Sequence, residues 1–140
     1  MQDNIIVKPS VEKQFDRFLR QGRVLFFSAP CGFGKTAVAE TLLSSREVLR
    51  LSADSAGFKL PSAEADWQIL LLDDLQDMQE EQDWNALCEL IRACLERRFV
   101  LLSRGTPPGS LMAFQYTGLM TVLEADDLLF DADAVRRLLR

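Results

Sequence analysis

The chain has 140 residues, of which 48% are hydrophobic and 26% are charged, and its formal net charge at pH 7 is −5. This length and composition predict a single globular domain over residues 1–140, with a core of ordinary size. The acidic balance argues against a broad nucleic-acid-binding surface on this chain. No apolar run approaches the roughly 20 residues that cross a bilayer, and residues 1–20 are too polar for a signal peptide, so we expect no membrane contact.

The chain contains three cysteines and no histidine. The spacing of Cys31, Cys88 and Cys94 fits neither a zinc site nor a disulfide framework, which favours a reducing, cytoplasmic location. Without an imidazole, any general base must be a carboxylate or another group.

Extended and helical patterns alternate along the chain. Near the N-terminus, apolar residues recur at helical spacing between Ser10, the expected N-cap, and Gly22, the expected end of that helix. The apolar runs predict strands at 24–28, 47–51, 68–74, 99–103 and 120–123, with Val48 and Leu49 in the core. Further helices are predicted from the loop after the first strand to residue 44 or 45, over 84–97, over 110–115 and over 131–140. Residues 52–66 are expected to form a loop.

This alternation predicts a three-layer α/β domain with a mainly parallel sheet of about five strands. In such sheets, ligands bind at the carboxyl ends of the strands. The last helical pattern breaks off at Arg140 without a stop signal, so we expect a truncated domain.

A loop of small residues lies between the first predicted strand and a helical pattern. It approaches the phosphate-loop pattern G-x-x-x-x-G-K-[ST], with Ala29 in place of the first glycine. Its glycines let backbone N–H groups reach phosphate oxygens, and the helix N-terminus adds partial positive charge. Lys35 adds a full charge for the β- and γ-phosphates, and the Thr36 hydroxyl can bind Mg²⁺. The predicted nucleotide-binding residues are Pro30, Cys31, Gly32, Phe33, Gly34, Lys35, Thr36 and Ala37; the alternative is a chance Gly-Lys-Thr in an ordinary turn.

Two carboxylates and an arginine follow later strands at the same edge of the predicted sheet. Asp73 and Asp74 come after four apolar residues, where Asp73 could hold Mg²⁺ and Asp74 could orient or deprotonate an attacking water. Arg104 follows the strand at 99–103, where its guanidinium could contact a γ-phosphate and distinguish ATP from ADP. The alternatives are an aspartate that begins a turn and a surface arginine in a Pro-rich turn.

Three blocks together resemble one family. The segment 29–36 is similar to the Pro-x-Gly-aromatic-Gly-Lys-Thr loop of the large ATP-binding LuxR-type transcriptional regulators, which include the maltose-regulon activator. The segment 102–108 resembles that family's Ser-Arg-x-x-Pro-Pro turn. The course from Leu111 to Phe130 follows the family's Leu…Gly…Leu…Asp-Leu-x-Phe pattern, and the whole resemblance covers roughly residues 5–140.

The resemblance implies a signal-transducing NTPase of the STAND class, inactive with ADP and able to self-associate with ATP. It implies the same nucleotide, Mg²⁺, water and sensor roles for five residues, namely Lys35, Thr36, Asp73, Asp74 and Arg104. The interval between Lys35 and Asp73 is shorter than is usual in the family, so this would be a shortened core. The family's sensor and helix-turn-helix domains would lie beyond Arg140, and DNA would be contacted only through them.

These observations predict a switch domain that binds ATP or ADP with Mg²⁺ and hydrolyses ATP slowly or not at all. Two alternatives remain. The segment 72–76 suggests an AAA-type or initiator-like ATPase, although the sequence shows no clear Walker B glutamate or arginine finger. The short interval after Lys35 suggests instead a degenerate P-loop module that binds partners without nucleotide.

Overall fold

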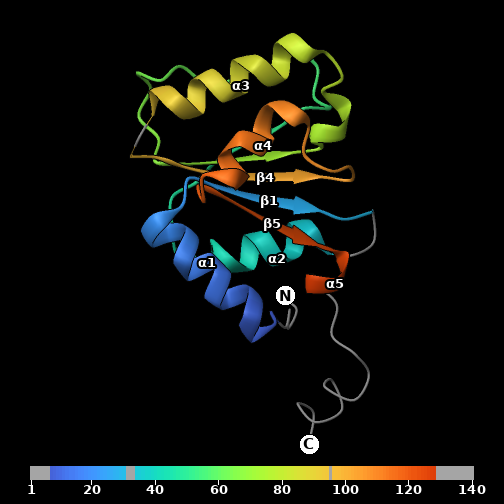
Figure 1. Ribbon diagram of the computed structural model, residues 1–140. Coiled ribbons are helices and arrows are strands. Elements are labelled where there is room, and N and C mark those ends of the chain that lie inside the picture. The colour runs from blue at the N-terminus through green and yellow to red at the C-terminus, as the bar shows by residue number, and fades with distance from the viewer. Residues whose placement is uncertain (1–6, 31–33, 95, 129–140) are drawn as a thin grey trace, which may run out of the picture.

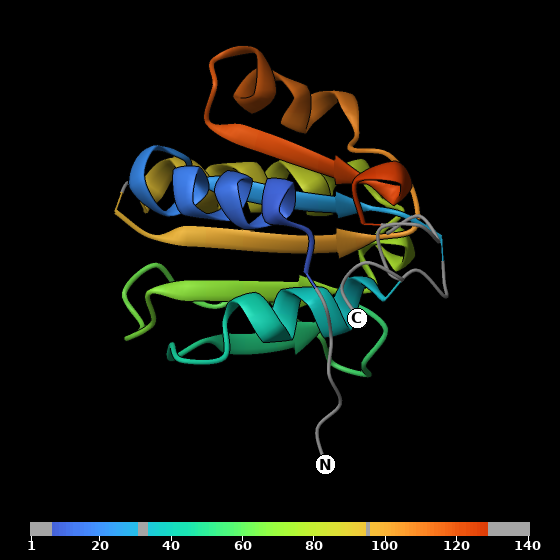
Figure 2. The same ribbon diagram turned by 90° about the horizontal axis from the view of Figure 1, so that it is seen from below.

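The computed structural model describes residues 7–30, 34–94 and 96–128. Its sheet has five strands in the order β2-β3-β4-β1-β5, and each neighbouring pair runs parallel. Figure 2 shows the arrows pointing the same way. The strands are β1 (Val24–Ser28), β2 (Leu49–Ser52), β3 (Ile69–Asp73), β4 (Arg98–Ser103) and β5 (Met120–Glu124). The helices are α1 (Pro9–Gln21), α2 (Lys35–Leu42), α3 (Glu81–Ala93), α4 (Gly109–Tyr116) and α5 (Ala125–Leu128), with a 3₁₀ turn η1 (Leu75–Asp77).

The helices cover both faces of the sheet. Figure 1 shows α3 and α4 on one face and α1, α2 and α5 on the other. Successive strand residues point to opposite faces, so Phe26 packs in the core under α3 and α4, whereas Leu25 and Phe27 pack in the core under α1 and α2. The predicted three-layer α/β architecture with a parallel sheet is confirmed.

The central strands are buried on both faces, as their continuous apolar runs predicted. Every residue of β1 is buried, and β1 has the predicted bounds. The edge strand β2 differs from the prediction, because it begins at Leu49, and both Leu49 and Val48 are only half-buried. A strand with a neighbour on one side only has less cover than a central strand.

The helix boundaries differ from the prediction more than the strand boundaries do. Helix α1 begins at Pro9 with Lys8 as its N-cap, and Ser10 lies inside the helix. Proline suits the first helical position because its φ is already helical and it has no N–H to leave unpaired. The predicted end is confirmed, since the N–H of Gly22 bonds to the carbonyl of Phe18 at 3.0 Å.

Helix α2 ends at Leu42 rather than at residue 44 or 45, and α3 ends at Ala93 rather than at Arg97. The chain must turn from α3 into β4, which begins at Arg98, so a helix could not continue to that point. Residues 53–68 join β2 to β3 without a helix, in agreement with the predicted loop. The short helix α5 was not predicted, and the helix expected over 131–140 lies outside the described residues. None of the helices in the described part of the chain is both long and apolar enough to span a bilayer.

Candidate functional site

The connections after β1 and β4 leave the sheet on opposite faces. These two strands are neighbours, yet β1 leads into α2 on one face and β4 leads into α4 on the other. Open parallel sheets bind ligands at such a point, because the diverging connections leave a crevice at the carboxyl ends of the strands. The topology therefore indicates a ligand site at this edge of the sheet.

A pocket of about 460 Å³ lies at this edge. It is lined by Gly34, Lys35, Thr36, Ala37, Asp73, Asp74, Gln76 and Arg104. Its volume is typical of small-molecule sites. A second cavity of equal volume lies at the amino ends of β3 and β4, so volume alone does not distinguish them. What distinguishes the first is its chemistry, since two cationic and two carboxylate side chains line it beside a helix N-terminus.

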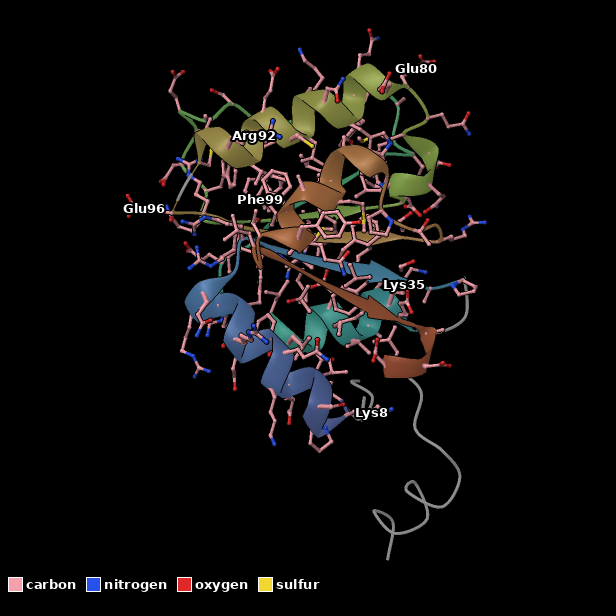
Figure 3. All side chains as sticks on the ribbon, in the orientation of Figure 1. Lys8, Lys35, Glu80, Arg92, Glu96 and Phe99 are labelled. Carbon is pink, nitrogen blue, oxygen red and sulfur yellow. The ribbon has the colours of Figure 1, made fainter. Side chains whose placement is uncertain are left out.

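The structure brings together seven residues that the sequence nominated, namely Gly34, Lys35, Thr36, Ala37, Asp73, Asp74 and Arg104. Pro30 is adjacent, since its carbonyl accepts a 3.3 Å hydrogen bond from Lys35 Nζ. Figure 3 shows Lys35 beside the arrowheads of the strands. Cys31, Gly32 and Phe33 lie outside the described residues.

The first turn of α2 lines the pocket with N–H groups that have no acceptor within the helix. Gly34 precedes the helix in a left-handed conformation (φ 74°, ψ 25°), which glycine adopts without steric cost. The first intrahelical bond is donated by the Val38 N–H to the Gly34 carbonyl at 2.9 Å, so the N–H groups of residues 35–37 have no acceptor within the helix. The first turn contains no acidic side chain. These features suit an anion.

Thr36 and Asp73 present two oxygen atoms side by side. The Thr36 hydroxyl donates to Asp73 Oδ2 at 3.1 Å. Neighbouring oxygens of an octahedral Mg²⁺, each about 2.1 Å from the ion, lie about 3.0 Å apart, so this pair has the spacing and the ligand type that Mg²⁺ requires. Within the described residues, no group of three or more acidic, Cys or His side chains could hold a metal. The pair would therefore share the ion with phosphate oxygens and water.

Asp74 has an unusual backbone and well-defined partners. Its φ of 58° and ψ of 38° place it in the left-handed region, where a non-glycine residue costs about 1–2 kcal/mol. Its Oδ2 lies 2.7 Å from Ser52 Oγ, a hydroxyl whose one proton is also within reach of Asp54 Oδ1 at 2.5 Å, and its Oδ1 accepts a hydrogen bond from Gln76 Nε2 at 3.3 Å. Its N–H donates to Asp73 Oδ1 at 2.7 Å. Left-handed non-glycine residues cluster at functional sites, because surrounding contacts must hold them.

Arg104 is exposed at the pocket rim, and its guanidinium makes no hydrogen bond or ion pair with any described residue. Its backbone N–H donates to Gln76 Oε1 at 3.1 Å. Gln76 was not predicted as a site residue, although it ends the segment 72–76 that suggested an ATPase. Its signal in the sequence was its position two residues after Asp74.

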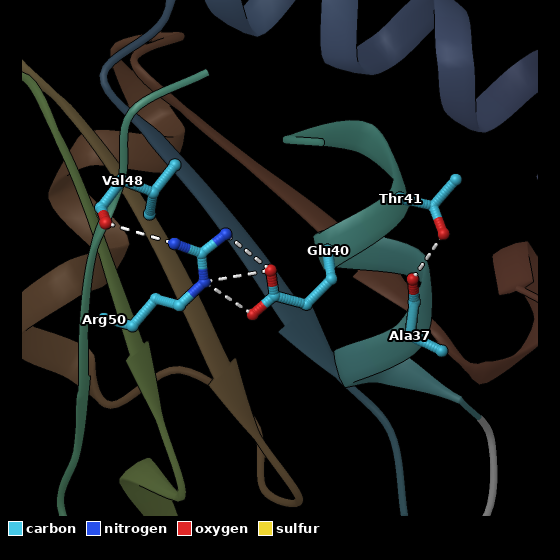
Figure 4. Close-up of polar contacts among 5 residues, drawn as sticks. All are labelled: Ala37, Glu40, Thr41, Val48 and Arg50. Carbon is cyan, nitrogen blue, oxygen red and sulfur yellow. Dashed lines mark hydrogen bonds and ion pairs between the residues drawn. The ribbon is translucent and has the colours of Figure 1, made fainter. Parts of the chain in front are cut away.

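An ion pair ties α2 to the edge strand β2. Arg50 donates to both carboxylate oxygens of Glu40 at 2.7–2.9 Å, as Figure 4 shows. Chiefly through these hydrogen bonds, Arg50 lowers the pKa of Glu40 below its usual value. The pair connects the helix that carries Lys35 and Thr36 with the strand that ends in Ser52.

In comparisons with known proteins, no family model matches this chain, and no curated protein matches it. What can be inferred about its function therefore comes from the residues of the pocket.

Proposed function

We propose that this chain is a nucleotide-binding switch domain that takes ATP or ADP together with Mg²⁺ in the pocket beside α2. The observation that carries the proposal is the meeting of three features in that pocket. These are the N-terminus of α2 with Lys35, the oxygen pair of Thr36 and Asp73, and the guanidinium of Arg104, which has no partner among the described residues. A polyphosphate with a bound cation has the chemistry that matches all three.

Each feature has a separate role in the proposal. The phosphates lie at the N-terminus of α2 and on Lys35, whose 3.3 Å hydrogen bond to a neutral carbonyl is readily exchanged for a charged phosphate oxygen. Thr36 and Asp73 hold Mg²⁺, which neutralises phosphate charge. Arg104 faces the terminal phosphate and so makes ATP and ADP unequal ligands.

Slow or absent hydrolysis is part of the proposal. Asp74 is the carboxylate proposed to orient a water, and its oxygens already contact Gln76 Nε2 and Ser52 Oγ, a hydroxyl that Asp54 also contacts. A switch needs different affinities for two nucleotide states in two conformations rather than fast turnover. The resemblance to LuxR-type regulators supports a cytoplasmic setting in which further domains of a parent regulator contact DNA through a helix-turn-helix, and in which the ATP-bound form self-associates.

Thermal unfolding with and without nucleotide tests the proposal. Nucleotide present at a hundredfold excess over its Kd stabilises the native state by about 2.7 kcal/mol, which raises the Tm of a domain of this size by roughly 10 °C. We expect this rise with ATP–Mg²⁺ and with ADP–Mg²⁺. Lys35→Ala should abolish it, whereas Lys13→Ala, a change on the exposed side of α1, should retain it.

The alternatives give different outcomes in this assay, in nucleotide titrations or in an ATPase assay. A wild-type chain whose Tm responds to neither nucleotide would be the interaction module without nucleotide. A Lys35→Ala variant that still binds ATP with unchanged affinity would contradict the site. Fast ATP turnover stimulated by DNA would indicate the AAA-type or initiator-like ATPase.

A further inference from the structure

Gln76 bridges two groups of the pocket that come from different strands. Its Nε2 donates to Asp74 Oδ1 at 3.3 Å, and its Oε1 accepts from the N–H of Arg104 at 3.1 Å. A primary amide can make both bonds because it carries a donor nitrogen and an acceptor oxygen. Its orientation follows from its partners, since a backbone N–H only donates and an ionised carboxylate only accepts.

This bridge stands where the pairing of β3 with β4 stops. The register of the two strands runs from Ile69 opposite Arg98 to Leu72 opposite Leu101. Beyond that point the left-handed Asp74 turns the chain into η1, and Leu75 is fully buried in the core. The buried Leu75 fixes η1, and the neighbouring amide of Gln76 supplies the next link to the end of β4.

The turn that carries Arg104 is also held from the side of β1. The Ser28 hydroxyl donates to the Gly105 carbonyl at 2.9 Å, and the Gly105 N–H donates to Ser103 Oγ at 3.1 Å. The backbone on both sides of the Arg104 side chain is therefore anchored, by Gln76 from η1 and by Ser28 from β1. The guanidinium itself has no partner among the described residues.

We infer that Gln76 is a positioning residue that lets the pocket discriminate a nucleoside triphosphate from a diphosphate. It holds the backbone of Arg104 where the guanidinium reaches a terminal phosphate, and it links that position to the carboxylate of Asp74. The inference rests on the proposed function, because it needs a nucleotide in the pocket. ADP lacks the phosphate that Arg104 contacts. Loss of the Gln76 amide therefore weakens the binding of ATP and leaves the affinity for ADP unchanged.

The test is the ratio of the Kd for ADP–Mg²⁺ to the Kd for ATP–Mg²⁺, measured by calorimetry on the full chain. Gln76→Met keeps the length of the side chain and removes both hydrogen bonds. Because one such bond contributes modestly, the ratio should fall about two- to tenfold, through ATP alone. Gln79→Met, the same change at an exposed position nearby, should leave the ratio unchanged. If Gln76→Met does not fold, Gln76→Ala removes the same amide.

A double-mutant cycle with Arg104→Met separates positioning from general damage. If Gln76 acts through Arg104, adding Gln76→Met to Arg104→Met changes the ratio by less than twofold. An equally large effect in both backgrounds, or an unchanged ratio in Gln76→Met, would overturn the inference while leaving nucleotide binding intact. If the wild-type chain binds neither nucleotide, the proposed function fails and the inference fails with it.

Discussion

The hydroxyl of Thr36 lies 3.1 Å from Asp73 Oδ2, although the two residues are 37 positions apart in the chain. Thr36 lies in the first turn of α2, which follows β1, and Asp73 ends β3; β1 and β3 are not neighbours in the sheet. The contact therefore depends on the whole parallel arrangement rather than on local sequence.

This pair leads to a prediction about Mg²⁺. Asp73→Asn keeps the size of the side chain and removes the charge that attracts the ion. In the wild type, Mg²⁺ should tighten ATP binding relative to EDTA, and in Asp73→Asn this gain should largely disappear. The measurement is ATP affinity by calorimetry with and without Mg²⁺. Asp77→Asn, on the exposed side of η1, is the matched control and should keep the gain; an Asp73→Asn variant with the full Mg²⁺ effect would remove Asp73 from the metal site.

The left-handed backbone of Asp74 predicts an unusual order of stabilities. Asp74→Gly and Asp74→Ala both remove the carboxylate, but only glycine adopts a φ of 58° without strain. The glycine variant should be more stable than the alanine variant by about 1 kcal/mol. At Asp77, whose φ is not positive, alanine should be the more stable of the two. Urea unfolding of the four variants measures this, and the same order at both positions would contradict the backbone assignment.

The Glu40–Arg50 pair predicts a pH dependence. The hydrogen bonds from Arg50 lower the pKa of Glu40 in the folded chain. The pair therefore stabilises the fold at pH values above the usual glutamate pKa of about 4.5, and this stabilisation is lost as the pH falls through the lowered pKa. Both side chains are well exposed, at 37% and 45%, which limits the gain to about 0.5–1 kcal/mol.

Glu40→Gln should therefore be slightly less stable than the wild type at pH 7 and equal to it at low pH. Thermal unfolding as a function of pH measures the difference. Glu89→Gln, an exposed position on α3, should match the wild type throughout. If the stability difference between Glu40→Gln and the wild type grew as the pH was lowered, the result would contradict a stabilising role for this ion pair.

Ser28 is one of the two buried polar residues in the described chain, with 9% of its surface exposed. Ser28→Ala removes the donor to the Gly105 carbonyl and should cost about 1 kcal/mol of unfolding free energy. It should also reduce the preference for ATP over ADP, because it loosens the turn that carries Arg104. Ser45→Ala, an exposed change, should do neither. A lower Tm with an unchanged preference would assign Ser28 to the fold alone.

The strands were predictable because strands that are buried on both faces have continuous apolar sequences. β1 has the predicted bounds, and the loop between β2 and β3 was recognised from its glycine, proline and small polar residues. The boundaries that failed depend on neighbours in space. Val48 and Leu49 are as apolar as core residues, and only the position of β2 at the sheet edge leaves them half-buried.

The candidate site was partly predictable from the sequence for a similar reason. The glycines, the lysine and the paired carboxylates follow predicted strands, and parallel strands bring their carboxyl ends to one edge. The role of Gln76 could not be predicted from the sequence, because the left-handed turn at Asp74 and the end of β4 bring its two hydrogen-bond partners to it. A side chain whose importance comes from linking a carboxylate to the backbone of a distant segment has no pattern of its own in a single sequence.

The sheet order also has a consequence for how the protein is made. β4 lies between β1 and β3, yet it is translated after both. A nascent chain that has emerged as far as Ala93 already holds Lys35, Thr36, Asp73 and Asp74, but it lacks the strand that sets their separation. Only when Ser103 has left the ribosome and β4 is inserted are these residues held at their final separation, so a nucleotide bound as proposed would stabilise the nearly finished domain rather than an early folding intermediate.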